Sequence, residues 1–371
     1  MMSKDEVLRK PASVEEKDSR GIKDKEITRR VLQKQYESNA SNFHVGQIHR
    51  ADKTFVWVYD CGNNDAAKQF DTPIDIIFVS HFHQDHVAGI KTLFDKNPTA
   101  KLYVPYLSEG EFFVQLWESG AVIDEKTWRF FQSVYFATHD IEADDPDLIR
   151  DMKRIFDEKK WQAKEPYGIW MFKTYTPVSD EAKTDIPSIL SAIKQKLGID
   201  DVKDLFKLDW SVIRNTFDEE SKKIIKEKFS KGTDTNKQNR ISMCLYTGPE
   251  KNCFFHFDRA GWLHTGDACL KNDEIYRQFY EAFKDYEEFI GTVVLPHHGS
   301  ENNHNPNLLK DFNADHFVVA YSFRVNASDY SFLNEKLEET KNIFFETYTN
   351  IYSEYSETKV TSFGDRIVEK V

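Results

Sequence analysis

The 371-residue chain contains no apolar run long enough to cross a membrane as a helix. Its opening segment, MMSKDEVLRKPASVEEKDSRGIKDKEITRR, also lacks the apolar stretch that a secretory signal requires. Cysteine is scarce: the four residues, none of them in a CxxC pair, predict neither a zinc finger nor a disulfide framework. These absences together predict a cytoplasmic protein that does not associate with membranes.

The chain also has fewer basic than acidic residues. Lysine and arginine number 50 against 62 aspartates and glutamates, which gives a net charge of −12. Such a balance is unfavourable for broad nucleic-acid binding, because a phosphate backbone attracts a basic surface. It does not exclude a nuclease, since two divalent cations in a cleft add about four positive charges locally.

A change in composition and hydrophobic pattern divides the chain into a tail and a folded region. Residues 1–41 are highly charged and predict a flexible N-terminal tail, with one short helix at EITRRVLQKQY. From residue 42 to 371, strand-like and helix-like segments alternate, which predicts one α/β domain. A lysine-rich stretch at about 185–232 predicts a helical insertion. Its lysines are typical of a solvated helix face, and a nucleic-acid patch is the alternative interpretation.

Ligand-type side chains are crowded into IIFVSHFHQDHVAGI, residues 76–90. His81 and His83 are two residues apart at the end of an apolar strand, so their side chains point the same way. Asp85 and His86 follow where the chain must turn, and they approach from another side. Imidazole and carboxylate are ligands of zinc, manganese and iron. The pattern favours a site for two metals over the alternative of a polar surface loop.

Two later strand-like segments also end in metal-type residues. WLHTGDA presents Asp267 behind a glycine, and TVVLPHHGS presents His297 and His298 before a glycine. Each motif alone is weak, because such residues are common in ordinary turns. Three strand ends of this kind in one chain indicate a shared metal site.

The HxHxDH motif at His81–His86 resembles that of the metallo-β-lactamase fold superfamily. Further motifs make the chain similar to one branch, the nuclease-like domain of bacterial competence DNA-uptake channel proteins and its soluble relatives. The motifs that carry this similarity span about residues 42–345, and they are HVGQ (44–47), YDCG (59–62), NRIS (239–242), LHTGD (263–267) and HHGS (297–300). The resemblance implies an αββα sandwich with two central mixed sheets flanked by helices, together with the helical insertion.

The same resemblance implies a cofactor of two divalent metal ions, Zn²⁺ or Mn²⁺, and a ligand set. His81 and His83 are expected at the first metal, and Asp85 and His86 at the second. Asp267 is expected to bridge the two. Either histidine of the HHGS motif would complete the second site, and His297 is favoured over His298.

Catalytic roles follow from the resemblance as expectations. A water between the two metals is the implied nucleophile, and Asp85 is expected to orient it. The remaining histidine, His298, together with Ser300, is expected to contact a phosphate oxygen or to protonate the leaving group.

The chain departs from the superfamily pattern in two places. The histidine that many members place on the first metal is absent, because the matching region FKTYTPVSD has Pro177 instead, and His139 is interpreted as a surface-loop residue. A late histidine of the branch, which touches substrate, is also absent from RVNASDY, Arg324 to Tyr330. The second departure bears on the choice of substrate.

The expected function is metal-dependent hydrolysis of a phosphodiester, with DNA, RNA, a cyclic nucleotide or a small phosphoester as the substrate. Hydrolysis of a lactam, lactone or thioester is the alternative within enzymes. A non-catalytic binding module stabilised by its metal is the alternative from another class.

Overall fold

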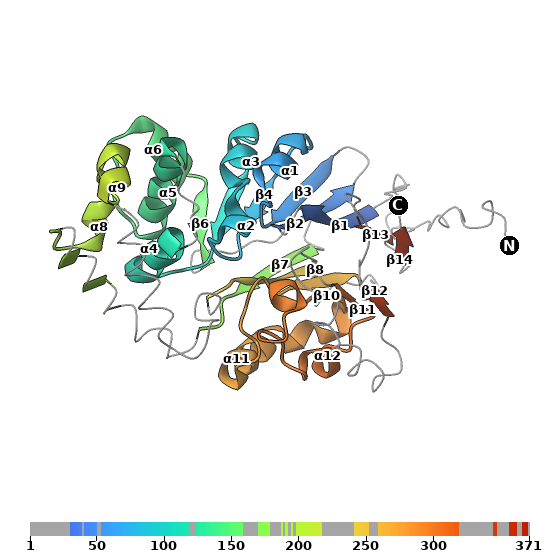
Figure 1. Cartoon of the computed structure of the whole chain (residues 1–371). Helices are drawn as coiled ribbons and strands as arrows, with labels where there is room; N and C mark the ends of the chain where they lie inside the picture. Colours follow the sequence, from blue (N-terminus) through green and yellow to red (C-terminus); the bar gives the residue numbers. More distant parts are fainter. Residues whose placement is uncertain are drawn as a thin grey trace, which may run out of the picture.

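A computed structural model shows two mixed β-sheets (Figure 1). The structure describes residues 30–38, 41–49, 53–118, 124–158, 170–178, 198–216, 241–251, 259–318, 344–346, 356–361 and 366–369, with isolated positions between 187 and 195. Within these ranges, one sheet has eight strands and the other has six.

The first sheet contains, in spatial order, β14 (Arg366–Glu369), β13 (Ser356–Thr361), β1 (Arg30–Ser38), β2 (Ser41–His49), β3 (Thr54–Tyr59), β4 (Ile76–Phe78), β5 (Lys101–Val104) and β6 (Ile155–Asp157). The second contains β12 (Phe344–Glu346), β11 (His316–Val318), β10 (Ile290–Val294), β9 (Gly261–His264), β8 (Cys244–Pro249) and β7 (Trp170–Tyr175). The α-helices are α1 (Asn64–Gln69), α2 (Gln84–Val87), α3 (Ile90–Lys96), α4 (Glu109–Glu118), α5 (Glu125–Thr138), α6 (Pro146–Met152), α8 (Val202–Leu205), α9 (Trp210–Thr216), α11 (Asp273–Phe283) and α12 (Leu308–Asp311). Two 3₁₀ helices are η3 (Lys284–Phe289) and η4 (Pro296–Gly299).

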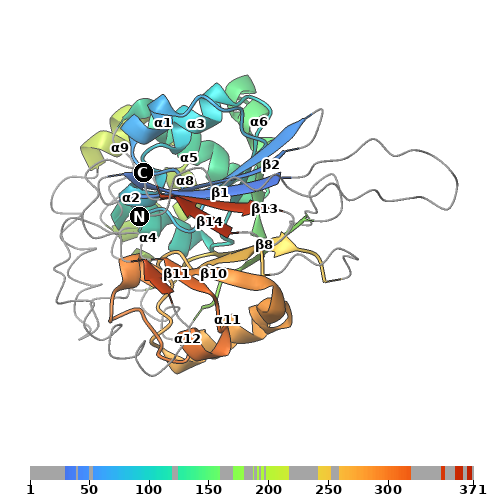
Figure 2. The same cartoon turned by 90° about the vertical axis from the view of Figure 1, so that its right-hand side faces the viewer.

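Helices cover the outer face of each sheet, so the molecule has four layers (Figures 1 and 2). Helices α1, α3, α4 and α5 share one buried core with strands β2 to β5 of the first sheet. Helices α11 and α12 share another core with strands β8 to β11 of the second sheet. The predicted αββα sandwich with two mixed sheets is therefore confirmed.

A third core lies between the two sheets and explains why the central strands are apolar at nearly every position. In β3, Phe55, Trp57 and Tyr59 belong to this inter-sheet core, while Val56 and Val58 belong to the core under the helices. Successive side chains of a strand point to opposite faces, so a strand covered on both sides alternates between two apolar environments. The continuous run in TFVWVY follows from this.

The end of the predicted tail is corrected by the structure. Residues 30–38 form strand β1 and do not continue a helix through EITRRVLQKQY. Strand β1 pairs antiparallel with β2 on one side and with β13 on the other. This pairing satisfies the backbone on both edges, whereas a short isolated helix is marginal in water. The assignment of 42–371 to a single hydrolase domain stays a prediction.

Several other predictions fall outside the described residues. Residues 1–29, most of the lysine-rich insertion and the segment Arg324–Tyr330 are among them. In the described part of the insertion, helices α8 and α9 agree with the helical pattern. Among the described residues, no helix has both the length and the apolar character that crossing a membrane would take.

The order of the strands brings the predicted motifs to a common edge. Strands β3, β4, β5 and β6 run parallel, so their carboxyl ends lie side by side. In the second sheet β9 and β10 are also parallel. The segment before β8 joins the two sheets, because the backbone N–H of Met243 donates to the carbonyl of Ser80 at 2.7 Å. The hydroxyl of Tyr59 donates to the carbonyl of Met243 at 2.6 Å.

Gly46, in the HVGQ motif, pairs directly with Trp57 of β3, and a Cβ atom at this position would overlap the indole ring. We expect Gly46→Ala to lower the free energy of unfolding by about 1–3 kcal/mol, because overpacking a filled core forces side chains off their rotamers. Urea denaturation would measure the loss. The same substitution in a Trp57→Phe background should cost less, and an equal cost in both backgrounds would contradict the steric explanation.

Candidate metal centre

The HxHxDH loop begins where β4 ends, at the carboxyl edge of the first sheet. His81 and His86 are fully buried, with no measurable exposure. His83 is the residue before helix α2, so the first turn of α2 carries Asp85 and His86. The rings of His81 and His83 lie 4.5 Å apart between centroids, and those of His81 and His86 lie 4.1 Å apart. The loop therefore gathers its three histidines into one cluster.

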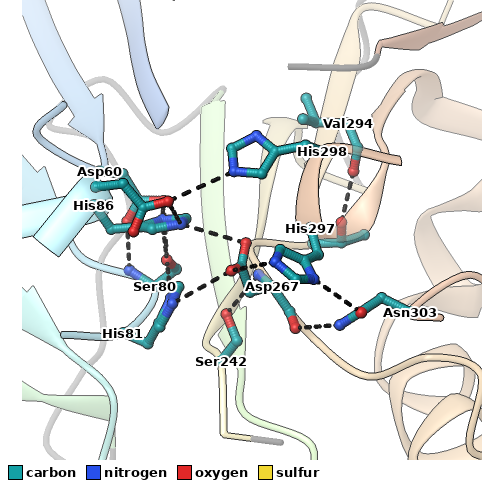
Figure 3. Close-up of polar contacts among 12 residues, drawn as sticks. Asp60, Ser80, His81, His86, Ser242, Asp267, Val294, His297, His298 and Asn303 are labelled. Carbon is teal, nitrogen blue, oxygen red and sulfur yellow. Dashed lines mark hydrogen bonds and ion pairs between the residues drawn. The ribbon is translucent and has the colours of Figure 1, made fainter. Parts of the chain in front are cut away.

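A buried carboxylate, Asp60, fixes the orientation of this cluster (Figure 3). Asp60 follows β3 in a left-handed conformation with φ of 59° and accepts the backbone N–H of Ser80 at 2.7 Å. It also accepts the Ser80 hydroxyl at 2.9 Å and the Nδ1–H of His86 at 2.7 Å. With its proton given to Asp60, the Ser80 oxygen accepts the Nδ1–H of His81 at 2.9 Å. Both imidazoles thus keep Nε2 for another ligand.

Asp267 comes from the second sheet, where it lies three residues after the end of β9. Its backbone N–H donates to the hydroxyl of Ser242 at 3.1 Å. The preceding Gly266 has φ of 53°, and a Cβ there would overlap the Ser242 hydroxyl and lie 2.8 Å from Ser80 Cβ. Glycine is required because the backbone of one sheet approaches the other this closely. The TGD motif therefore places the Asp267 carboxylate beside the histidine cluster.

The HHGS motif forms the turn after β10. His297 and His298 both have left-handed backbones, with φ of 47° and 56°, and Gly299 follows with φ of 76°. The backbone N–H of His297 donates to the carbonyl of Gly266 at 3.0 Å, which ties this turn to the Asp267 loop. Left-handed conformations of residues other than glycine cost on the order of 1–3 kcal/mol each, and they concentrate at functional sites.

Asp267 lies at the centre of the assembled site (Figure 3). Its Oδ1 is 3.3 Å from His86 Nε2, and its Oδ2 is 3.6 Å from His81 Nε2. His297 Nε2 lies 3.8 Å from Oδ2. The two carboxylate oxygens therefore face different histidines.

Asp85 and His298 form the outer part of the site. Asp85 Oδ2 lies 3.6 Å from the Nε2 atoms of both His86 and His298. Two overlapping groups result, each with one potential ligand atom per residue: His81, His86 and Asp267 in one, and Asp85, His86 and His298 in the other. Asp85 is the more exposed carboxylate, with 39% of its side chain accessible against 2% for Asp267.

The charges in this cluster are strongly coupled. Burial opposes ionisation of Asp267, but the charges of His86 and His81 outweigh it and hold the pKa of that carboxyl well below its usual range. Burial likewise opposes protonation of His86, but Asp267, Asp60 and Asp85 together raise the pKa of its imidazole well above the usual value. Burial, followed by the neighbouring His86, lowers the pKa of His81. Without a metal ion the three carboxylates thus favour a proton on His86, which metal binding at Nε2 would displace.

The buried atoms of the cluster fit a metal ion. His81 Nε2, His86 Nε2 and Asp267 Oδ1 are buried and have no hydrogen-bond partner among the residues that the structure describes. Leaving such atoms unsatisfied costs free energy, so they imply a ligand that they share. Neutral imidazole and carboxylate donors suit Zn²⁺ or Mn²⁺. Asp60 and Ser80 supply the outer hydrogen bonds that orient metal-binding histidines.

The structure separates the predicted residues into those that meet and those that do not. His81, Asp85, His86 and Asp267 lie within the two groups of potential ligand atoms, and the ring of His83 lies against that of His81. His298, and not the favoured His297, lies beside Asp85 and His86. The hydroxyl of Ser300 accepts the backbone N–H of Asn302 at 3.3 Å, a contact within the turn. His139 ends helix α5, and its ring stacks on Tyr135.

Sequence reasoning assigned no role to Asp60, Ser80, Ser242 or Asn303. Asp60 stood within the quoted YDCG motif and Ser242 within NRIS, so a signal for both was present. Ser80 and Asn303 carry no motif of their own and are found only from their contacts.

Comparisons with known proteins give weak similarities. No family model matches the chain, and no curated protein matches it. One similar solved structure is the metallo-beta-lactamase fold protein YhfI from Bacillus subtilis, at 8% identity and a TM-score of 0.39, covering 88% of this chain and 99% of that one. Another is a long form RNase Z from yeast, at 13% identity and a TM-score of 0.35, covering 76% of this chain and 35% of that one.

These similarities are too low to argue from. Two mixed sheets with helices outside, and an HxHxDH loop at their common edge, agree with the architecture that the metallo-β-lactamase resemblance implied. The expected fold is thus confirmed, whereas the superfamily itself stays a resemblance. The competence-channel branch stays a prediction.

We expect Asp60→Asn to weaken divalent metal binding by about 10–100-fold, because an amide replaces one of the two accepting oxygens with a donor and cannot accept the Ser80 N–H, the Ser80 hydroxyl and the His86 Nδ1–H together. Isothermal titration with Mn²⁺ would measure the affinity. Asp65→Asn, on the exposed first turn of α1, is the matched control and should bind as the wild type does. Unchanged affinity in a folded Asp60→Asn protein would contradict the orienting role.

Proposed function

We propose that the chain is a binuclear metal-dependent hydrolase that acts on a phosphodiester. The observation that carries this proposal is the position of Asp267. It is a buried carboxylate whose two oxygens face His81 and His86 separately. A carboxylate in this position suits two cations that share it, one on each oxygen.

The proposed ligands divide between two sites. The second ion would be held by Asp85, His86 and His298 together with Asp267. The first ion would be held by His81 and His83, also together with Asp267. The contacts of Asp85 with both His86 and His298, each at 3.6 Å, support His298 as the residue that completes the second site.

When bound, two such ions would lower the pKa of a shared water and stabilise the attacking and leaving oxygens of an in-line displacement. The side chains of the chain supply the remaining functions. Asp85 is the carboxylate of the site that reaches solvent, so it accepts a hydrogen bond from the incoming water and orients it. Asp60 and Ser80 hold His81 and His86 in place, which keeps the reacting geometry rigid.

The charge balance of the site favours an anionic substrate. Its carboxylates are Asp60, Asp85 and Asp267, whereas two divalent ions carry four positive charges. With neutral imidazoles the loaded site is left with net positive charge, although the whole chain is acidic at −12. A bound cation dominates the local field, so a phosphodiester would be attracted to this site. DNA, RNA, cyclic nucleotides and small phosphoesters all present this group.

Hydrolysis assays with Mn²⁺ or Zn²⁺ test the proposal. The substrates are single- and double-stranded nucleic acids, cyclic nucleotides, bis-p-nitrophenyl phosphate and a lactam. We expect turnover of at least one phosphodiester, and Asp85→Ala should lower kcat by about 100-fold or more, because the group that orients the water is lost. Gln84→Ala, the exposed neighbour in the same loop, is the control and should keep full activity.

Other outcomes would overturn the proposal. Turnover of the lactam without any phosphodiester would show that the site serves carbonyl chemistry. A protein that binds metal and hydrolyses none of the substrates would agree with a metal-stabilised binding module. Full activity in Asp85→Ala would contradict the role assigned to that carboxylate.

A further inference from the structure

The proposed first site has two histidines from one loop and a shared carboxylate, and the sequence offers no middle histidine for it. We propose that His297 is the further protein ligand of this site and that Asn303 is the positioning residue that aims it. This inference rests on the proposed binuclear site and deepens it. It separates the roles of the two adjacent histidines, with His297 on the first metal and His298 on the second.

The side chain of Asn303 makes two contacts that have no use in a simple turn (Figure 3). Its Oδ1 lies 3.0 Å from His297 Nδ1, and its Nδ2 donates to the backbone carbonyl of Asp267 at 3.0 Å. Asn303 is itself fully buried. Because its amide donates to Asp267, its oxygen is left to accept the Nδ1 proton of His297. The Asn303 side chain thus fixes the position of the loop that carries Asp267. It also fixes the tautomer of His297.

Three histidines are then held in the same manner. His81 donates from Nδ1 to Ser80, His86 to Asp60 and His297 to Asn303. In each case Nε2 is directed at the carboxylate of Asp267, at 3.6, 3.3 and 3.8 Å respectively. A partner on the far ring nitrogen is the usual arrangement of a metal-binding histidine. His297 shares Oδ2 with His81, which places it on the first site.

The backbone explains how adjacent histidines reach different metals. Both residues are left-handed, and the ring centroids lie 5.8 Å apart. His298 Nε2 faces Asp85, whereas His297 Nε2 faces Asp267. The bond from the His297 N–H to the Gly266 carbonyl holds this turn against the Asp267 loop. About 34% of the His297 side chain is exposed, so this side of the site is accessible from solvent.

Titration of the metal-free full-length chain with Co²⁺ tests the assignment, using visible absorbance and calorimetry. The wild type should bind two ions per chain. His297→Asn is the key variant, because its amide reproduces the Nδ1 position and tolerates a left-handed backbone but lacks Nε2. It should weaken binding of one ion by about 10–100-fold or more and leave the other unchanged. His297→Gln, which reaches toward the Nε2 position, should restore part of that loss.

Asn303 is tested by separating its two contacts. Asn303→Asp keeps an acceptor for His297 and loses the donor to Asp267, so it should retain two-ion binding within about 10-fold of the wild type. Asn303→Leu removes both contacts and should lose about 10–100-fold at one ion. If Asp and Leu weaken binding equally, Asn303 is a packing residue and the positioning role is wrong. Asn302→Ala, exposed in the same turn, is the control and should change neither affinity.

The outcomes distinguish this inference from the proposed function. Two ions bound with wild-type affinity in His297→Asn would overturn the assignment of His297 while leaving the binuclear site intact. In that case a raised KM with unchanged kcat in the same variant would assign His297 to substrate contact. A wild-type chain that binds fewer than two ions would overturn the binuclear site itself.

Discussion

The contact between Asp267 and the two imidazoles of His81 and His86 is the constraint around which the structure is arranged. It joins the two sheets at their common edge and sets a buried carboxylate against two fully buried imidazoles. Its unsatisfied atoms would be costly in a protein without a ligand. The short distance between the backbones at Gly266, the hydroxyl of Ser242 and the link between Met243 and Ser80 all maintain this contact.

The residues that hydrogen-bond the proposed ligand histidines share one arrangement. Each sheet contributes buried partners: Asp60 and Ser80 come from the first sheet, and Asn303 comes from the turn region of the second. Both sets act on Nδ1 and direct Nε2 inward, so the tautomers are set before any ion binds. Asp85 differs, because it is partly exposed, and its ion pairs within the described part of the chain are with His86 and His298. Asp60, Ser80 and Asn303 therefore hold the site together, whereas Asp85 is the side chain that contacts water.

Much of this arrangement could be predicted from the sequence. Spacing placed His81, His83, Asp85 and His86 at one strand end, and two later strand ends pointed to Asp267 and the histidine pair. The resemblance supplied the division of these residues between two metals. The choice between His297 and His298 could not be made, because it depends on a left-handed turn that no local pattern specifies. Strand β1 was missed because it lies between β2 and β13, and its pairing with β13 joins residues far apart in the sequence. Asn303 was missed because its role exists only when residues 267 and 297 are brought together.

The central claim is that two cations share the carboxylate of Asp267. A crystal structure of the protein grown with Mn²⁺, with anomalous data collected near the manganese edge, tests it most directly. The account predicts two anomalous peaks about 3.5–4 Å apart, one on each oxygen of Asp267. A single peak, or peaks that do not contact Asp267, would contradict it.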